Sequence, residues 1–84
     1  MTGKYTPLEQ YLRDLPSSHD EVTLTFERIE QILNKALPPS AQEHRAWWGN
    51  QMRGTHVESL AWMDAGWMVD TVDLKRKWVR FVRQ

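Results

Sequence analysis

The hydrophobic period of the chain changes after Gly66, and this change constrains the fold more than any other feature of the sequence. Apolar and polar residues alternate over residues 67–72 and again over 78–83, with the basic string Lys75-Arg76-Lys77 between the two segments. Alternation with a period of two is typical of half-buried strands, whereas amphipathic helices repeat about every 3.6 residues. The sequence therefore predicts a β-hairpin with a basic turn, preceded by helices.

Three pairs of residues before Gly66 predict helix starts. In each pair a Ser or Thr is followed three residues later by Glu, so that each side chain can satisfy a backbone N–H group of the other residue. The pairs are Thr6 with Glu9, Ser40 with Glu43, and Thr55 with Glu58. Pro7 would then occupy the first position of the first helix. We expect the first helix to end before Pro16, the third at Gly49-Asn50, and the fourth at Gly66 in the left-handed conformation.

A short strand and a second helix are predicted between the first and third helices. Val22-Thr23-Leu24-Thr25 alternates and is rich in β-branched residues, which is typical of a strand. The following apolar residues share one face of a helix over residues 26–34, with Thr25 as its N-terminal cap and Asn34 at its end.

These elements predict an α+β fold in which four short helices pack on a three-stranded antiparallel sheet. An isolated hairpin is only marginally stable, and residues 22–25 are the obvious third strand. The order of elements is also that of a winged helix-turn-helix with one helix inserted before the wing. A chain of 84 residues usually holds one core, so we expect a single domain over residues 1–84 with an ordered core over about 5–83. The expected core consists of Leu12, Leu24, Phe26, Ile29, Leu33, Leu60, Ala61, Trp67, Val79 and Phe81.

Composition excludes several classes of protein. The chain has no cysteine, which excludes a disulfide scaffold, a zinc ribbon and a cysteine nucleophile. Eleven Lys and Arg balance eleven Asp and Glu, so the net charge gives no support to a nucleic-acid or membrane partner. No segment approaches the roughly 18 apolar residues of a membrane span, and the first residues lack the apolar core of a signal peptide. We therefore expect a cytoplasmic protein with no membrane partner.

Several short motifs are spread over nearly the whole chain. They are Pro7-Leu8 with Tyr11-Leu12, residues 22–26 with Ile29-Glu30, Leu37-Pro38-Pro39-Ser40-Ala41, His44-Arg45-Ala46-Trp47-Trp48 followed by Asn50, Ala61-Trp62 with Ala65-Gly66-Trp67, and Val72-Asp73-Leu74 with Val79 and Phe81. With these motifs the chain resembles a family of small bacterial and phage-associated domains of unknown function. The resemblance implies a shared fold and supplies no function. The chain has more tryptophan than the resemblance leads us to expect, and we expect Trp78 to be the departure, as a local solution to packing.

Five tryptophans in 84 residues are unusual, and the simplest explanation is a small core that uses large rings. Trp47 and Trp48 are neighbours on the predicted third helix, so their side chains diverge by about 100° and both cannot face one core centre. One of the two is therefore expected to be partly exposed. The pair could serve packing, or it could form a surface for stacking or for a protein partner.

Basic residues gather at the end of the sequence, although the net charge is zero. From residue 75 onward the chain holds Lys75, Arg76, Lys77, Arg80 and Arg83 and no acidic residue. On an exposed hairpin they could contact DNA phosphates as a wing does, or they could protect the sheet from edge-to-edge aggregation. Gln42 and Arg45 on the third helix have side chains of the types that bind base edges, although these types are common on any helix surface.

No catalytic residue or metal ligand is predicted. His19, His44 and His56 are too scattered for a metal-binding spacing. Asp70 with Asp73-Leu74-Lys75 weakly resembles the metal site of nucleases, but the second part falls where the hairpin is expected to turn. We therefore expect a non-enzymatic protein without a metal or cofactor.

Two functions remain open. The first is a small winged-helix-like DNA-binding module that contacts duplex DNA through Lys75, Arg76, Lys77 and Arg80, with Gln42 and Arg45 as candidate contacts to bases. The second is a protein-interaction or self-association domain that uses Trp47 and Trp48. Salt distinguishes the two, because phosphate contacts weaken steeply as salt rises and an aromatic interface does not.

Overall fold

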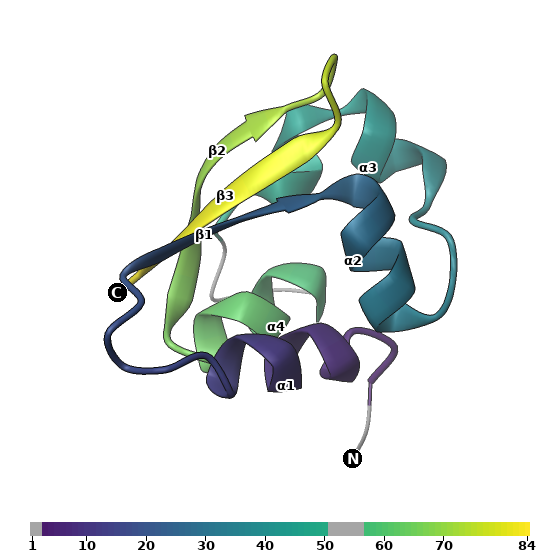
Figure 1. Ribbon diagram of the computed structural model, residues 1–84. Helices are drawn as coiled ribbons and strands as arrows, with labels where there is room; N and C mark the ends of the chain where they lie inside the picture. The colour runs from purple at the N-terminus through teal and green to yellow at the C-terminus, as the bar shows by residue number, and fades with distance from the viewer. Residues whose placement is uncertain (1–2, 51–56) are drawn as a thin grey trace.

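The computed structural model describes residues 3–50 and 57–84, which form a small helical layer against one sheet (Figure 1). The described elements, in chain order, are α1 (Thr6–Arg13), β1 (Glu21–Thr25), α2 (Phe26–Leu33), α3 (Pro39–Glu43), the 3-10 helix η1 (Arg45–Trp48), α4 (Val57–Asp64), β2 (Trp67–Asp73) and β3 (Trp78–Arg83). Within the described residues, four α-helices and a three-stranded antiparallel sheet therefore confirm the predicted α+β class.

The predicted hairpin is present, and its second strand is the centre of the sheet. The strand order is β1-β3-β2, and both pairings are antiparallel. Val79 of β3 lies opposite Leu24 of β1 and Val72 of β2. A bulge at Asp70 shifts the register of β2 between its two ends. The segment 22–25 is thus the third strand that the sequence predicted.

One face of the sheet is covered by helices and the other is open. On β3, Val79 and Phe81 are fully buried, whereas Trp78, Arg80 and Val82 are only partly buried. This alternation places the odd-numbered residues of β3 against the core. The helices lie on that side of the sheet, with α1 and α4 at the opposite end of the molecule from the β2–β3 turn (Figure 1).

Three predicted helix ends are confirmed. The Thr25 side chain accepts a hydrogen bond of 3.0 Å from the backbone N–H of Arg28, so Thr25 caps α2. Asn34 follows α2 with a φ of 58°, in the left-handed region that Asn tolerates. Gly66 has a φ of 87° between α4 and β2, a conformation that glycine adopts without a steric penalty.

Two predicted caps are wrong. α1 already includes Thr6, whose Oγ1 instead accepts a hydrogen bond from the N–H of Gly3, and Tyr5 precedes the helix. Pro7 therefore occupies the second position of α1. α3 begins at Pro39 without a side-chain cap, because a proline at the first position has no N–H group that needs a partner. The third pair depends on Thr55, which lies outside the described residues.

The predicted third helix is broken into two short pieces. His44, between α3 and η1, has extended backbone angles of φ −125° and ψ 115°. In a continuous helix Trp47 and Trp48 would point about 100° apart. After the break, the two rings meet edge to face with centroids 4.7 Å apart. Both tryptophans thus lie in η1, after the break, and their rings belong to one aromatic cluster although the residues are adjacent in the sequence.

The predicted core is confirmed except for Leu60, which is only partly buried. Apolar residues occur all around α4, so its pattern does not select a face. The helix in fact buries Ser59, Ala61 and Trp62. Further buried residues outside the predicted set are Tyr5, Leu8, Leu37, Ala41, Trp48 and Val72. Large rings therefore contribute more of the core than we expected.

Candidate nucleic-acid interface

The turn between β2 and β3 is fixed by one carboxylate. Oδ1 of Asp73 accepts hydrogen bonds from the backbone N–H groups of Lys75 and Arg76, at 3.1 and 2.9 Å. The N–H of Lys77 donates to the Asp73 carbonyl at 2.7 Å, and Lys77 has a φ of 59°. The side chain and the carbonyl of Asp73 therefore both stabilise the turn. Asp73 thus has the role that Asp often has in turns, where its side chain accepts from backbone N–H groups a few residues on.

The turn is also attached to the helices beside it. Nζ of Lys77 donates to Oε1 of Gln42 in α3 at 3.0 Å, and the Lys77 carbonyl accepts from the N–H of Phe26 at 2.9 Å. A guanidinium N–H of Arg45 in η1 donates to the carbonyl of Val72, near the end of β2. The structure thus brings Gln42 and Arg45 to the same end of the molecule as the basic turn.

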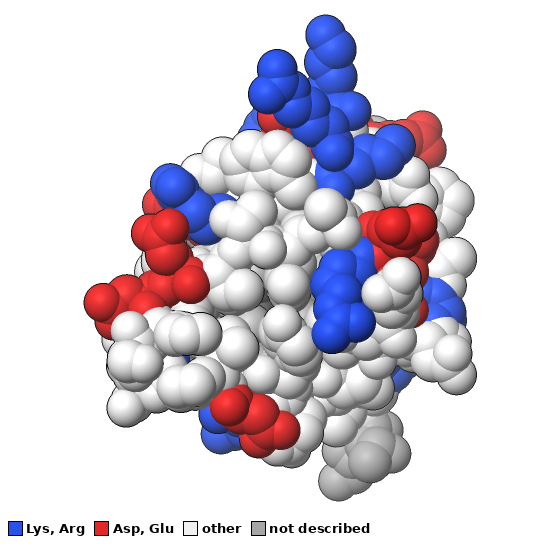
Figure 2. Space-filling model, in the orientation of Figure 1, with Lys and Arg blue, Asp and Glu red and all other residues white. Residues whose placement is uncertain are grey.

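The side chains of the turn form a positively charged projection. Figure 2 shows Lys and Arg side chains gathered at the end of the molecule where Figure 1 places the β2–β3 turn. Lys75, Arg76 and Lys77 are exposed, and none of them forms an ion pair with any described residue. Glu27 and Glu43 are acidic residues of the neighbouring helices. The basic turn, residues 75–77, nevertheless presents three cations without a carboxylate partner.

Arg80 lies apart from this projection, on the open face of the sheet. Its Nε and Nη2 both donate to Oδ2 of Asp70, at 3.0 and 2.5 Å. The hydrogen bond from Arg80 is the main reason why the pKa of Asp70 lies below its ordinary value, and the same bond raises the pKa of Arg80. Because Asp70 neutralises it, Arg80 adds little net charge for a phosphate.

Trp47 and Trp48 belong to an aromatic cluster inside the molecule. Trp48 is only 2% exposed, and its ring is stacked between Phe26 and Trp62 at centroid distances of 5.2 and 5.8 Å. Its Nε1 donates to the Ala41 carbonyl. Trp47 is partly buried and contacts the ring of Tyr5 edge to face. Of the pair, only Trp47 offers a surface to a partner in this conformation.

Asn50 has a structural role that the sequence analysis did not assign. Its Oδ1 accepts from the N–H of Val69 at 2.8 Å and from Nε1 of Trp62 at 3.0 Å. Its Nδ2 donates to the Val69 carbonyl at 2.9 Å. Asn50 thereby occupies the free edge of β2 as a neighbouring strand would, and Arg45 does the same at Val72. Its position in the Trp-Trp-x-Asn motif was the only sequence signal for this role.

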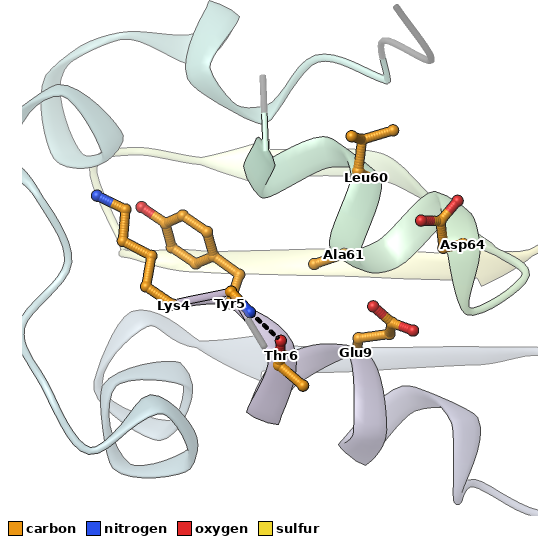
Figure 3. Close-up of a pocket in the computed structure, with 8 residues that line it drawn as sticks. Lys4, Tyr5, Thr6, Glu9, Leu60, Ala61 and Asp64 are labelled. Atoms are coloured by element: carbon orange, nitrogen blue, oxygen red, sulfur yellow. Dashed lines mark hydrogen bonds between the residues drawn. The ribbon is translucent and has the colours of Figure 1, made fainter. Parts of the chain in front are cut away.

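A hollow of about 410 Å³ lies between the start of α1 and α4, and it is lined by Gly3, Lys4, Tyr5, Thr6, Glu9, Leu60, Ala61 and Asp64 (Figure 3). Glu9 is paired with Arg13 at 2.9 Å. Burial raises the pKa of the Tyr5 hydroxyl, and the charge of Glu58 adds to the effect, so this hydroxyl releases its proton less readily than that of an ordinary tyrosine. The lining offers no base paired with a nucleophile.

The described residues also lack two kinds of site. They contain no group of three or more His, Asp or Glu side chains that could hold a metal ion. Nor do they contain a helix with the length and apolar character that crossing a bilayer requires.

The fold and these contacts define a small α+β domain whose basic hairpin turn rests against α3. A family model described as a domain of unknown function, DUF7662, matches residues 5–84. The chain therefore belongs to this family. No curated protein and no solved structure matches it.

Proposed function

We propose that this chain is a small non-enzymatic DNA-binding module of winged-helix-like shape, which contacts phosphates through the β2–β3 turn. The observation that carries the proposal is the basic turn itself. Lys75, Arg76 and Lys77 project from a backbone that Asp73 fixes, and no described carboxylate pairs with them. A rigid turn favours binding because little conformational entropy is lost when phosphates are contacted.

Contacts to bases contribute less in this proposal. α3 spans only five residues, and Oε1 of Gln42 already accepts from Lys77. Arg45 donates to Val72, so part of its guanidinium is occupied as well. Phosphate contacts position a protein on DNA and carry no sequence information, so we expect weak sequence preference.

Fluorescence polarisation with a labelled random duplex tests the proposal. We expect binding at low salt that weakens on a log-log salt plot with a slope of about −0.9 for each phosphate contact. The double variant Lys75→Glu/Arg76→Glu removes two exposed cations and keeps the contacts of Lys77. Its affinity should fall at least about tenfold, since two attractive contacts become repulsive.

The matched control is Lys4→Glu/Lys35→Glu, which changes the charge by the same amount at exposed positions away from the turn. It should bind more tightly than the turn variant. The proposal fails if wild type does not bind duplex at low salt, or if the turn variant binds as well as wild type. Self-association of wild type in sedimentation, combined with absent DNA binding, would instead favour an interaction domain that uses Trp47.

A further inference from the structure

We infer that Trp78 and the basic turn form a site for single-stranded nucleic acid, in which an unpaired base stacks on the indole while phosphates contact the turn. This inference rests on the proposed function and specifies the strand form that the same site takes. It depends on three observations: the surroundings of Trp78, the polarity of the open sheet face, and the cations adjacent to the ring.

Trp78 is the tryptophan that does not serve the core. Trp48, Trp62 and Trp67 are buried, and Trp47 packs against them. Trp78 is partly exposed and lies on the opposite face of the central strand from buried Val79. Among the described residues, its ring meets no other aromatic ring, and its Nε1 has no hydrogen-bond partner. The expectation that Trp78 is a local solution to packing stays a prediction.

Trp78 is partly exposed, and the residues opposite it on the open face are polar. Directly across the two neighbouring strands lie Thr25 of β1 and Asp73 of β2. Along β3, Arg80 separates Trp78 from Val82 on the same face. A protein interface is most apolar at its centre, whereas this face offers one ring within a polar and charged surface. Such a surface fits a ligand with π-faces and charges better than it fits an apolar protein patch.

The cations beside the ring supply charge complementarity. Lys77 precedes Trp78 directly, and Lys75 and Arg76 are exposed on the same turn. Asp73 lies next to the ring, but its Oδ1 faces the backbone N–H groups of the turn. Asp70 is paired with Arg80, and Glu21, a further carboxylate of the open face, lies farther from the ring, opposite Val82. A phosphodiester chain running past the turn would therefore meet cations without a carboxylate partner next to a partly exposed indole.

Base pairing decides which nucleic acid can use the ring. In a duplex both faces of a base are covered by its stacked neighbours, so a protein ring reaches an unpaired base far more easily. Stacking of one base on an aromatic side chain strengthens binding by about five- to a hundredfold. We therefore expect base stacking on Trp78 to strengthen the binding of single strands. It should not strengthen the binding of a duplex or of a phosphate chain without bases.

Polarisation with three labelled probes tests the inference at low salt. The probes are a twelve-nucleotide oligothymidine, an abasic oligomer of the same length and charge, and a random duplex. Wild type should bind oligothymidine at least about fivefold more tightly than the abasic oligomer. Trp78→Leu should bind both oligomers equally and keep the salt slope of wild type. Trp78→Phe, which retains a ring, should recover part of the preference.

Fluorescence gives a second measurement that does not depend on the Leu variant folding. Oligothymidine should quench tryptophan emission of wild type more than that of Trp78→Phe, whereas the abasic oligomer should quench neither. The inference is overturned if wild type binds oligothymidine and the abasic oligomer equally, or if Trp78→Leu keeps the preference. In either case, salt-dependent binding of the random duplex by wild type that is lost in Lys75→Glu/Arg76→Glu would still support the proposed function. Absence of binding to all three probes overturns both.

Discussion

At the scale of single residues, polar side chains of this small protein mainly satisfy backbone groups that the sheet leaves unpaired. β2 is an edge strand, and an unpaired edge can associate with another chain. Asn50 provides both a donor and an acceptor to Val69, and Arg45 provides a donor to Val72. Asp73 similarly satisfies two N–H groups of the turn. These side chains replace strands and loops that a larger domain would use.

Asn50→Ala should therefore destabilise the protein. The change leaves Nε1 of fully buried Trp62 without its acceptor and removes both hydrogen bonds to Val69. We expect the free energy of unfolding to fall by about 1–3 kcal/mol. Asn50→Asp keeps the acceptor oxygen and loses the donor, so its loss should be smaller. Urea unfolding followed by circular dichroism measures both, with Ser18→Ala in an exposed turn as the control. Equal stability of Asn50→Ala and wild type would contradict this role.

At the scale of the elements, some helices end at a residue whose own conformational preference marks the end, and others do not. Gly66 closes α4 because its left-handed φ suits glycine, and Asn34 ends α2 in the same way. The end of α3 is different. The backbone leaves the helical conformation at His44, and the rings of Trp47 and Trp48 then both reach the aromatic cluster. No glycine, asparagine or proline stands at this helix end, so the local sequence did not predict it.

Gly66→Ala tests the local kind of helix end. A Cβ at Gly66 would meet no atom within 4 Å, so the whole cost arises from the φ of 87°. We expect a loss of about 1–2 kcal/mol in the free energy of unfolding. The control is Gly3→Ala, where a Cβ makes only an ordinary contact of 3.8 Å with Thr6. Thermal unfolding should show a lower midpoint for Gly66→Ala alone, and equal midpoints would refute the argument.

The elements also show which parts of the fold were accessible from sequence. The change of period after Gly66 predicted the hairpin, and Thr25 and Asn34 predicted the limits of α2, because these features act between near neighbours. The caps at Thr6 and Ser40 failed because Gly3 and Pro39 provide other local solutions. The prediction that α4 buries Leu60 was wrong for another reason. Its apolar residues surround the helix, so only the tertiary structure selects Trp62 over Leu60.

At the scale of the whole molecule, one contiguous core connects the helices with the sheet. It extends from Leu8 and Leu12 of α1 through Ile29 of α2 to Val79 and Phe81 of β3. Because these residues share one core, we expect the loss of a single contact to reduce the stability of the whole domain. Small domains of this kind usually unfold in one cooperative step.

Ile29→Ala should reduce the free energy of unfolding by about 2–5 kcal/mol, because Ile29 is fully buried and its removal leaves a cavity. Ile32→Ala is the matched control on the same helix, since Ile32 is only partly buried. Its loss should be clearly smaller. Urea midpoints of the two variants give the comparison. A negligible shift for Ile29→Ala, or a larger one for Ile32→Ala, would show that the helix face is misassigned.

The candidate site was predictable in part, for the same physical reason as the fold. Lys75, Arg76 and Lys77 are consecutive, and alternation around them predicted the turn that carries them. The contact of Lys77 with Gln42 joins residues 35 positions apart in sequence, which a local pattern does not encode. Pairing of Arg80 with Asp70 depends in turn on the hairpin register and its bulge. The position of Trp78 on the open face follows from the alternation, but its lack of ring contacts required the structure.

The order of the strands has a consequence for synthesis on the ribosome. β1 ends at Thr25 and pairs only with β3, which ends at Arg83, and β2 likewise pairs only with β3. At about 5–20 residues per second, β1 waits on the order of 3–12 seconds for its partner during translation. During that interval α1 and α2 can form, whereas Leu24 has no strand to pair with. The sheet, the basic turn and the open face therefore form together, when β3 leaves the ribosome and pairs with β1 and β2.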